Sequence, residues 1–395
     1  MSETLICVAD DVGLRVWLER VLDMEWELEC VTSSDLSRVT RLTQATGARV
    51  VIIAVDENDS TRSLKTFAAV QKACPRVRLV GLSQRISQDL LLDIMRTGAR
   101  DCLITSQDSD SAVERIRKVW LCAEAESEPY AAYSTQRNIT AVLGASHAVD
   151  TRFFSQNFAT EVCNQTDDAN VLAIDTHATD NQTFYYDSLN RLTLKDLINR
   201  GDSFDRAFVE TALEEYSPGL RLLSGQVTET ELDGDAGADL FITITQLATL
   251  FDQVIIRIDQ SATEEWLKAI GSDIGSIIIV AHQTVDQIQR TQALTKLIKT
   301  HVQGSCTVNF GIDGFEKRAN LSISDAEKTA DCDFRFALPL EWRYRLDSIN
   351  AGVSMSALPY RTAYQKRLSQ FVREHQRRKS VSKKKGLFGR AREEV

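Results

Sequence analysis

In the first 122 residues, short apolar runs alternate with segments whose apolar positions recur every three or four residues. The runs have the length and composition of buried strands, and the segments between them have the periodicity of amphipathic helices. This pattern predicts strands at residues 5–9, 50–55, 77–82 and 102–104. Strands that alternate with helices at this spacing predict a parallel sheet with helices on both faces.

The alternation resumes at residue 138. A run rich in β-branched residues, 139–143, reaches Gly144-Ala145, and a helical pattern at residues 153–162 follows a short loop. Further runs of strand length are expected at residues 171–174, 251–259, 277–281, 306–310 and 336–339. We therefore expect an α/β protein of two doubly wound, mainly parallel-sheet domains.

A polar segment with one proline and no sustained apolar periodicity, residues 123–137, separates the two patterns. It predicts a first domain at residues 1–122, a linker at 123–137 and a second domain at 138–372. The remaining residues, 373–395, are basic and are expected to form a flexible tail.

The formal net charge of the 395 residues is −10, and its distribution is uneven. Residues 366–395 hold eleven Lys and Arg against three Glu, which makes +8 and leaves −18 on residues 1–365. An acidic body argues against nucleic acid as a partner. The basic tail suits a membrane surface that carries anionic lipid.

The eight cysteines form no CxxC pair, and the chain begins without a basic and apolar signal pattern. We expect reduced thiols, no metal site and a cytoplasmic location. The longest apolar stretches, such as residues 277–281, are too short to span a bilayer.

The loop after residue 143 stands where a phosphate-binding loop would lie. Such a loop needs several glycines, a lysine and a hydroxyl that holds Mg²⁺. Here Gly144 is present, the lysine is missing, Asp150 would repel phosphate, and Arg152 takes the place of the hydroxyl. The segment resembles the deviant phosphate loop of the ParA/MinD ATPases, and most closely their pilus-assembly branch, the TadZ/CpaE proteins. In that resemblance Ser146 replaces the signature lysine, and Thr151 and Arg152 stand at the Lys/Thr and Ser/Thr positions that end the loop.

Further segments of the second domain resemble the same branch in order. Residues 194–198 and 216–225 match two of them, and Asp175 matches an aspartate that touches the metal or the attacking water. Residues 251–259 resemble the Walker B strand, with Arg257 at the metal-side aspartate. We expect Arg257 to form a salt bridge with Asp259, two residues further along the strand.

The adenine side of the site resembles the family better. Asn309 matches an asparagine at the end of a strand that bonds adenine. Residues 336–339, with Pro339, and residues 348–353 resemble the last strand and the segment that bracket the base. The resemblance implies a deviant P-loop NTPase fold whose phosphate side has lost its chemistry.

The first domain is similar to receiver domains of two-component signalling, which have the CheY-like fold. Asp10 and Asp11 match the acidic pair for Mg²⁺, and Ser83 lies near the hydroxyl position. An alternative without metal is that these aspartates cap the helix that follows them.

Two receiver positions differ from the family. Ala54 stands at the phosphoacceptor and Thr105 at the conserved lysine, so aspartyl phosphorylation lacks its chemistry. Asp56, two residues beyond Ala54, is the alternative acceptor.

Taken together, the resemblance to TadZ/CpaE implies a non-catalytic localisation and assembly factor for a Tad/Flp pilus secretion system. Its expected partners are a second copy of itself, the secretion ATPase and other assembly proteins, at the inner face of the membrane or a cell pole. No cofactor is expected. The alternatives are a weakly active ATPase that binds ATP and Mg²⁺, and a receiver-type signalling protein switched through Asp56.

Overall fold

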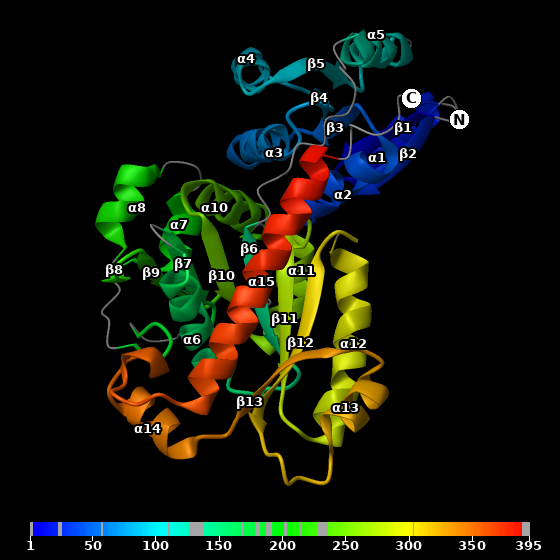
Figure 1. The fold of residues 1–395 in the computed structure, drawn as a ribbon. Helices are drawn as coiled ribbons and strands as arrows, with labels where there is room; N and C mark the ends of the chain where they lie inside the picture. Colours follow the sequence, from blue (N-terminus) through cyan, green and yellow to red (C-terminus); the bar gives the residue numbers. More distant parts are fainter. Residues whose placement is uncertain are drawn as a thin grey trace.

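The structure is a computed structural model. It describes residues 3–22, 26–56, 58–109, 111–125, 138–166, 169–177, 182–186, 192–200, 204–213, 215–227, 236–302 and 304–388. These residues form two α/β units, and the expected two-domain α/β fold is confirmed (Figure 1). Residues 126–137 of the predicted linker and 389–395 of the predicted tail lie outside the described ranges.

The first unit is a five-stranded parallel sheet in the order β2-β1-β3-β4-β5. Its strands are β1 (Glu3–Val8), β2 (Trp26–Val31), β3 (Val50–Ala54), β4 (Arg78–Ser83) and β5 (Ala99–Ile104). Its helices are α1 (Val12–Leu22), α2 (Leu36–Thr46), α3 (Ser60–Ala73), α4 (Gln88–Arg96) and α5 (Ala112–Ala125). This strand order is the doubly wound order of CheY-like domains.

The second unit is an eight-stranded sheet in the order β13-β12-β11-β6-β10-β7-β9-β8, in which only β8 is antiparallel to its neighbour among the pairings described. Its strands are β6 (Ile139–Gly144), β7 (Val171–Asp175), β8 (Glu215–Ser217), β9 (Leu220–Ser224), β10 (Gln253–Arg257), β11 (Ile274–Ala281), β12 (Thr307–Phe315) and β13 (Phe334–Pro339). Its α-helices are α6 (Thr151–Asn164), α7 (Leu194–Arg200), α8 (Arg206–Ala212), α10 (Ala236–Leu250), α11 (Thr263–Ile270), α12 (Val285–His301), α13 (Ile323–Ala330), α14 (Trp342–Asn350) and α15 (Ala363–Phe388). Two 3₁₀ turns, η1 (Gln260–Ala262) and η2 (Met355–Ala357), complete it.

Strand β6 shows why the second sheet is covered on both faces. Ala141 and Leu143 point into the core beneath α10 and α11, whereas Val142 points into the core beneath α6 and α15. Successive residues of a strand face opposite sides, so a run that is apolar at every position requires cover on both sides. The central strand thereby holds the loop after Gly144 at the middle of the sheet.

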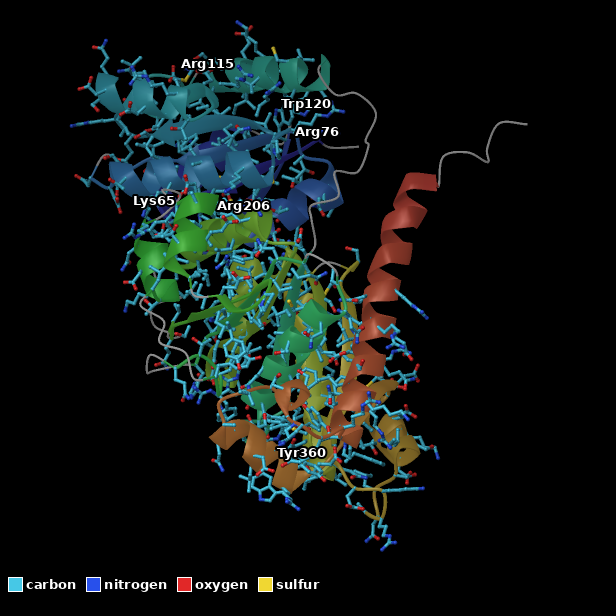
Figure 2. All side chains as sticks on the ribbon, turned by 60° about the vertical axis from the view of Figure 1, so that its left-hand side comes forward. Lys65, Arg76, Arg115, Trp120, Arg206 and Tyr360 are labelled. Atoms are coloured by element: carbon cyan, nitrogen blue, oxygen red, sulfur yellow. The ribbon has the colours of Figure 1, made fainter. Side chains whose placement is uncertain are left out.

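Helix α10 joins the two units. Most of its apolar residues belong to the core of the second unit, but Phe241 and Ile242 are buried in the core of the first. Lys65 of α3 forms an ion pair with Asp239 of α10 at 3.2 Å, and Figure 2 shows Lys65 where the units meet. A helix that packs against two cores needs apolar residues on more than one face, which explains this composition.

Helix α15 passes through Val372, where the second domain was expected to end, and continues to Phe388. His375, beyond that boundary, is buried against the rings of Phe158 and Phe371. The first part of the expected flexible tail is therefore helical and packed. No helix in the described ranges combines the length and apolar character needed to cross a membrane.

Candidate functional site

Three neighbouring strands of the second sheet end side by side at its carboxyl edge, where ligands of such sheets bind. β10 lies between β6 and β7, and in the strand register Arg257 is opposite both Val142 and Asp175. The loop that follows Gly144 runs over this edge into α6. The candidate site is therefore the group of side chains around Gly144, Asp175 and Arg257.

The loop is folded tightly over Gly144. A Cβ at that position would lie 3.0 Å from the carbonyl oxygen of Ser146 and 3.2 Å from Thr151 Cγ2. Ser146 also accepts hydrogen bonds from two loop N–H groups. Val149 donates to its carbonyl oxygen at 3.1 Å, and Ala148 donates to its hydroxyl oxygen at 3.2 Å.

A phosphate loop works by pointing its N–H groups at the anion. In this loop and the first helical turn many of them are already bonded within the chain: those of Ala145, Ala148, Val149, Thr151, Phe153 and Phe154. Ser146 thus supports the loop conformation, and the two N–H groups that it accepts are already used within the loop.

Asp150 caps helix α6, a role that the sequence did not predict. Its carboxylate accepts the N–H of Phe153 at 3.0 Å, which satisfies one of the unpaired donors of the first turn. The Tyr185 hydroxyl donates to the same oxygen at 3.4 Å. Burial raises the pKa of Tyr185, and the Asp150 charge raises it further, so the phenol remains a neutral donor.

Asp175 is the centre of the site. It is 0% exposed. Arg257 donates from Nη1 to one carboxylate oxygen at 2.6 Å, and Arg152 Nε lies 3.4 Å from the other. The backbone N–H groups of His177 and Phe184 each donate to it at 3.2 Å. A buried carboxylate requires this degree of compensation.

The expected salt bridge between Arg257 and Asp259 is wrong. β10 ends at Arg257, so Asp259 lies beyond the strand and bonds instead to His177 Nδ1 at 2.9 Å. Partial burial raises the pKa of Asp259, but hydrogen bonds from Ser261 and the nearby His177 and Arg257 outweigh it, so the net pKa lies below the ordinary value.

Arg257 also fastens the loop to the sheet. Its Nε donates to Thr151 Oγ1 at 3.0 Å, so one guanidinium connects β10, β7 and the start of α6. A planar guanidinium that donates to two residues fixes their geometry better than a flexible ammonium group does. Phe184, which donates to Asp175, has a positive φ of 54°, an uncommon conformation for a bulky residue.

Mg²⁺ and triphosphate do not fit these residues. Two guanidinium groups lie against the carboxylate that a hard cation would need, and many of the loop donors are bonded internally. Nowhere in the described ranges do three or more His, Cys, Asp or Glu side chains form a group suited to a metal.

The two residues that were expected on the adenine side, Asn309 and Pro339, lie at different levels of the sheet. Asn309 is not at the end of its strand, because β12 continues to Phe315, and its amide donates to Ser276 Oγ at 3.3 Å. In the register it is level with Ile278 of β11, which is level with Val142, two residues before Gly144. Pro339 does end β13 at the carboxyl edge.

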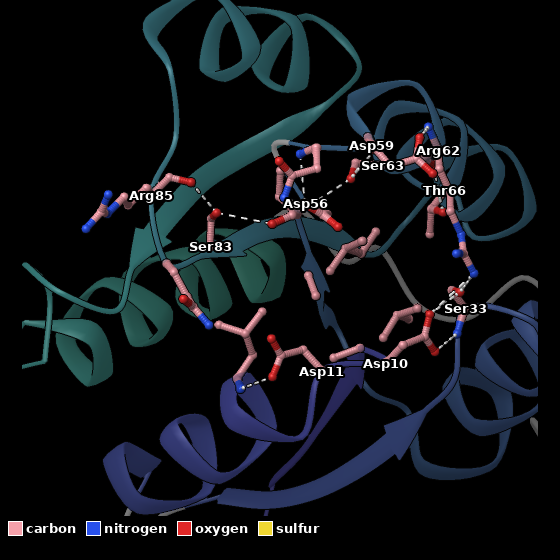
Figure 3. A pocket seen from close by; sticks show the side chains of 18 residues that line it. Asp10, Asp11, Ser33, Asp56, Asp59, Arg62, Ser63, Thr66, Ser83 and Arg85 are labelled. Atoms are coloured by element: carbon pink, nitrogen blue, oxygen red, sulfur yellow. Dashed lines mark hydrogen bonds and ion pairs between the residues drawn. The ribbon is translucent and has the colours of Figure 1, made fainter.

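A pocket of about 480 Å³ lies at the carboxyl edge of the first sheet (Figure 3). Of the receiver positions, Asp10, Asp11, Ala54, Asp56 and Ser83 line it. Thr105 is outside that lining, and its N–H donates to the Ser83 carbonyl at 2.9 Å.

The acidic residues of this pocket have local partners. Asp11 accepts the N–H groups of Gly13 at 2.6 Å and Leu14 at 3.2 Å, as a helix cap does. Asp10 accepts the Ser33 N–H at 2.9 Å and pairs with Arg62 at 3.4 Å.

The other two polar receiver positions that line the pocket, Asp56 and Ser83, are also bonded locally. Asp56 accepts from the Asn58 backbone at 2.8 Å, and Ser83 Oγ donates to the Val55 carbonyl at 3.1 Å. The alternative of aspartates as local caps thus has direct support at Asp11.

No protein-family model matches the chain, and no curated protein matches it. The chain does match solved structures. The ParA family ATPase from Chlorobium tepidum TLS is 18% identical, with a TM-score of 0.52, over 60% of this chain and 98% of that protein. The cell division ATPase MinD of Pyrococcus furiosus is 15% identical over 61% and 99%, with a TM-score of 0.48. A CheY-like protein (tadZ) from Pseudomonas aeruginosa PAO1 is 20% identical over 30% and 99%, with a TM-score of 0.28.

The Chlorobium likeness shows that the longer part of the chain has the ParA-type fold. The strand order of the shorter part is the CheY-like order. The chain therefore has a receiver-like unit followed by a ParA/MinD-like unit, as the sequence predicted.

Proposed function

We propose that this protein is a non-catalytic ParA/MinD-like assembly and localisation factor of a Tad/Flp pilus secretion system, which acts through protein contacts. The observation that carries the proposal is the Arg257–Asp175–Arg152 network, because it places two cations where a metal-dependent ATPase needs an available carboxylate. The pilus assignment rests on the ordered TadZ/CpaE-like segments of the sequence and on the combination of a receiver-like and a ParA-like unit.

The network supports a scaffold role in a second way. In a nucleotide switch the ligand connects the loop, the Walker B strand and the neighbouring strand. Here Arg257 connects the same elements by its own contacts with Thr151 and Asp175. The arrangement is therefore held without nucleotide.

Self-association through this edge is part of the proposal. Leu340 and Trp342 are 50% and 57% exposed and directly follow the carboxyl end of β13. Exposed apolar side chains that lie together on a surface are typical of interaction surfaces. The other proposed partners are the secretion ATPase and assembly proteins, together with an anionic membrane surface for the basic end of the chain.

The test is calorimetric titration of the purified full chain with ATP and ADP, with and without Mg²⁺, with the oligomeric state followed in the same samples. We expect no binding heat, a dimer already present, and phosphate release no greater than that of Asp175→Asn. Micromolar binding with a nucleotide-dependent dimer would support the weakly active ATPase instead.

A further inference from the structure

Two cysteines face each other across neighbouring strands of the first unit. β1 and β2 pair in parallel, and Cys7 is the register partner of Cys30 (β1 and β2 in Figure 1). Adjacent strands lie about 4.8 Å apart, within the range of about 4.4–6.8 Å between the Cα atoms of disulfides. The backbone therefore already holds the two residues at bridging distance.

The two thiols lie on the same face of the sheet. Both pack in the core beneath α1, with Leu14 and Leu18 in the same cluster. The other buried cysteines have different surroundings. Cys74, for example, contacts the hydroxyl of Thr43.

Only one of the two thiols, that of Cys30, can be reached from solvent. Cys7 is 0% exposed, because β1 is covered on both edges and by α1. Cys30 is partly exposed and lies on β2, the edge strand of the sheet. A small reagent from solvent therefore reaches Cys30 first.

The charges around the pair favour the same order of reaction. The hydrogen bond from Cys7 lowers the pKa of Cys30 to about 7 and outweighs the effect of burial. Arg15 of α1 lowers it as well, while Glu19 of α1 and Glu29 of β2 raise it. The same hydrogen bond, with burial, raises the pKa of Cys7. At neutral pH a substantial fraction of Cys30 is therefore the nucleophilic thiolate, whereas Cys7 is a neutral thiol.

We propose that Cys7 and Cys30 form an oxidation site at which hydrogen peroxide converts the dithiol to a reversible disulfide. The Cys30 thiolate attacks one peroxide oxygen, the O–O bond breaks, and hydroxide leaves and takes up a proton, which gives Cys30 sulfenic acid and water. The Cys7 sulfur then attacks the Cys30 sulfur, the S–O bond breaks, and its oxygen leaves as a second water. Peroxide is reduced by two electrons and the two thiols are oxidised.

The site lies close to the contact between the units. β2 leads into α2, where the Ser37 hydroxyl donates to the Lys268 carbonyl and Arg41 Nη1 donates to the Thr300 carbonyl at 2.7 Å. A bond between Cys7 and Cys30 would anchor the strand that enters this helix. The proposal is independent of the pilus function and of nucleotide binding.

The test treats the reduced full chain with hydrogen peroxide at neutral pH and maps the product by mass spectrometry. We expect the loss of two hydrogens, a peptide pair linked through Cys7 and Cys30, and recovery with dithiothreitol. Cys30→Ser should abolish the reaction, Cys7→Ser should leave a trappable sulfenic acid on Cys30, and Cys74→Ser should behave as the unmodified chain. Oxidation first at another cysteine, or no linked pair, would overturn the proposal.

If the Cys7 variant folds poorly, a kinetic measurement on the unmodified chain still tests the proposal. The rate at which iodoacetamide alkylates Cys30 in the unmodified chain should have its midpoint near pH 7. Cys7→Ala should lower the rate at pH 7 about tenfold, because the thiolate then loses its donor. A midpoint near that of a free thiol in the unmodified chain would also overturn the proposal.

Discussion

The two carboxyl edges of this protein hold their carboxylates in opposite ways. In the first unit Ala54 lines an open pocket of about 480 Å³ together with the acidic residues Asp10, Asp11 and Asp56. In the second unit Arg257 and Arg152 close onto Asp175, which is completely buried. One edge is open and its carboxylates are exposed, and the other is closed around a buried carboxylate.

The difference follows from what each carboxylate does for the fold. Asp11 caps α1, and Asp10 accepts a hydrogen bond from the Ser33 N–H group. Both carboxylates therefore stabilise the fold at a solvated edge without a metal ion. Asp175 lies where water cannot screen it, and a buried charge without a partner costs several kcal/mol. A cation is therefore required at the second edge and not at the first.

The strongest test of this contrast is Asp175→Ala. The substitution leaves Arg257 and Arg152 without their shared anion, and we expect it to reduce the free energy of unfolding of the second unit by about 3 kcal/mol. Hydrogen exchange of peptides from β7 and β10 measures the effect locally.

Two variants serve as controls for Asp175→Ala. Asp175→Asn keeps one acceptor oxygen, which can serve the N–H group of His177 or that of Phe184 but not both, and should cost less than Asp175→Ala. Asp286→Ala breaks an exposed pair with Arg290 and should change stability by no more than about 0.5 kcal/mol. Equal effects of Asp175→Ala and Asp286→Ala would mean that the network contributes nothing to the fold.

The fold was largely predictable because apolar periodicity marks strands directly, as at residues 171–174, which lie in β7. The Arg257–Asp175–Arg152 network was not predictable from the sequence. Asp175 and Arg257 are 82 positions apart, and they meet only because β10 pairs with β7 in one register. Strand order and register arise from long-range packing that a single sequence does not display. The same limit explains why Asn309 was expected at a strand end.

A smaller effect is expected when the missing carboxylate of the first edge is restored. Ala54→Asp places a third charge near Asp10 and Asp11, and like charges should destabilise the first unit by about 1 kcal/mol at neutral pH. Millimolar Mg²⁺ should reverse the loss, because carboxylate oxygens are its preferred ligands. Urea unfolding with and without Mg²⁺ measures both effects.

Ala54→Asn is the matched control, since it has the same shape without the charge. It should show no response to Mg²⁺. If Ala54→Asp also fails to respond, Asp10 is held by Arg62 and Ser33 too firmly to bind a cation, and the first edge is as closed as the second.

The smallest effect is expected at Asp56, the alternative phosphoacceptor. Its side chain is exposed and accepts from the Asn58 backbone, and Asp56→Asn keeps an oxygen for that bond. Stability should change by less than about 0.5 kcal/mol. Incubation with acetyl phosphate and Mg²⁺ should add no phosphoryl group to either form, because Thr105 stands at the lysine position and lies outside the pocket lining. A phosphorylated species that disappears in Asp56→Asn would show that the first edge kept its chemistry by moving the acceptor two residues, and the signalling alternative would then replace the scaffold role for this unit.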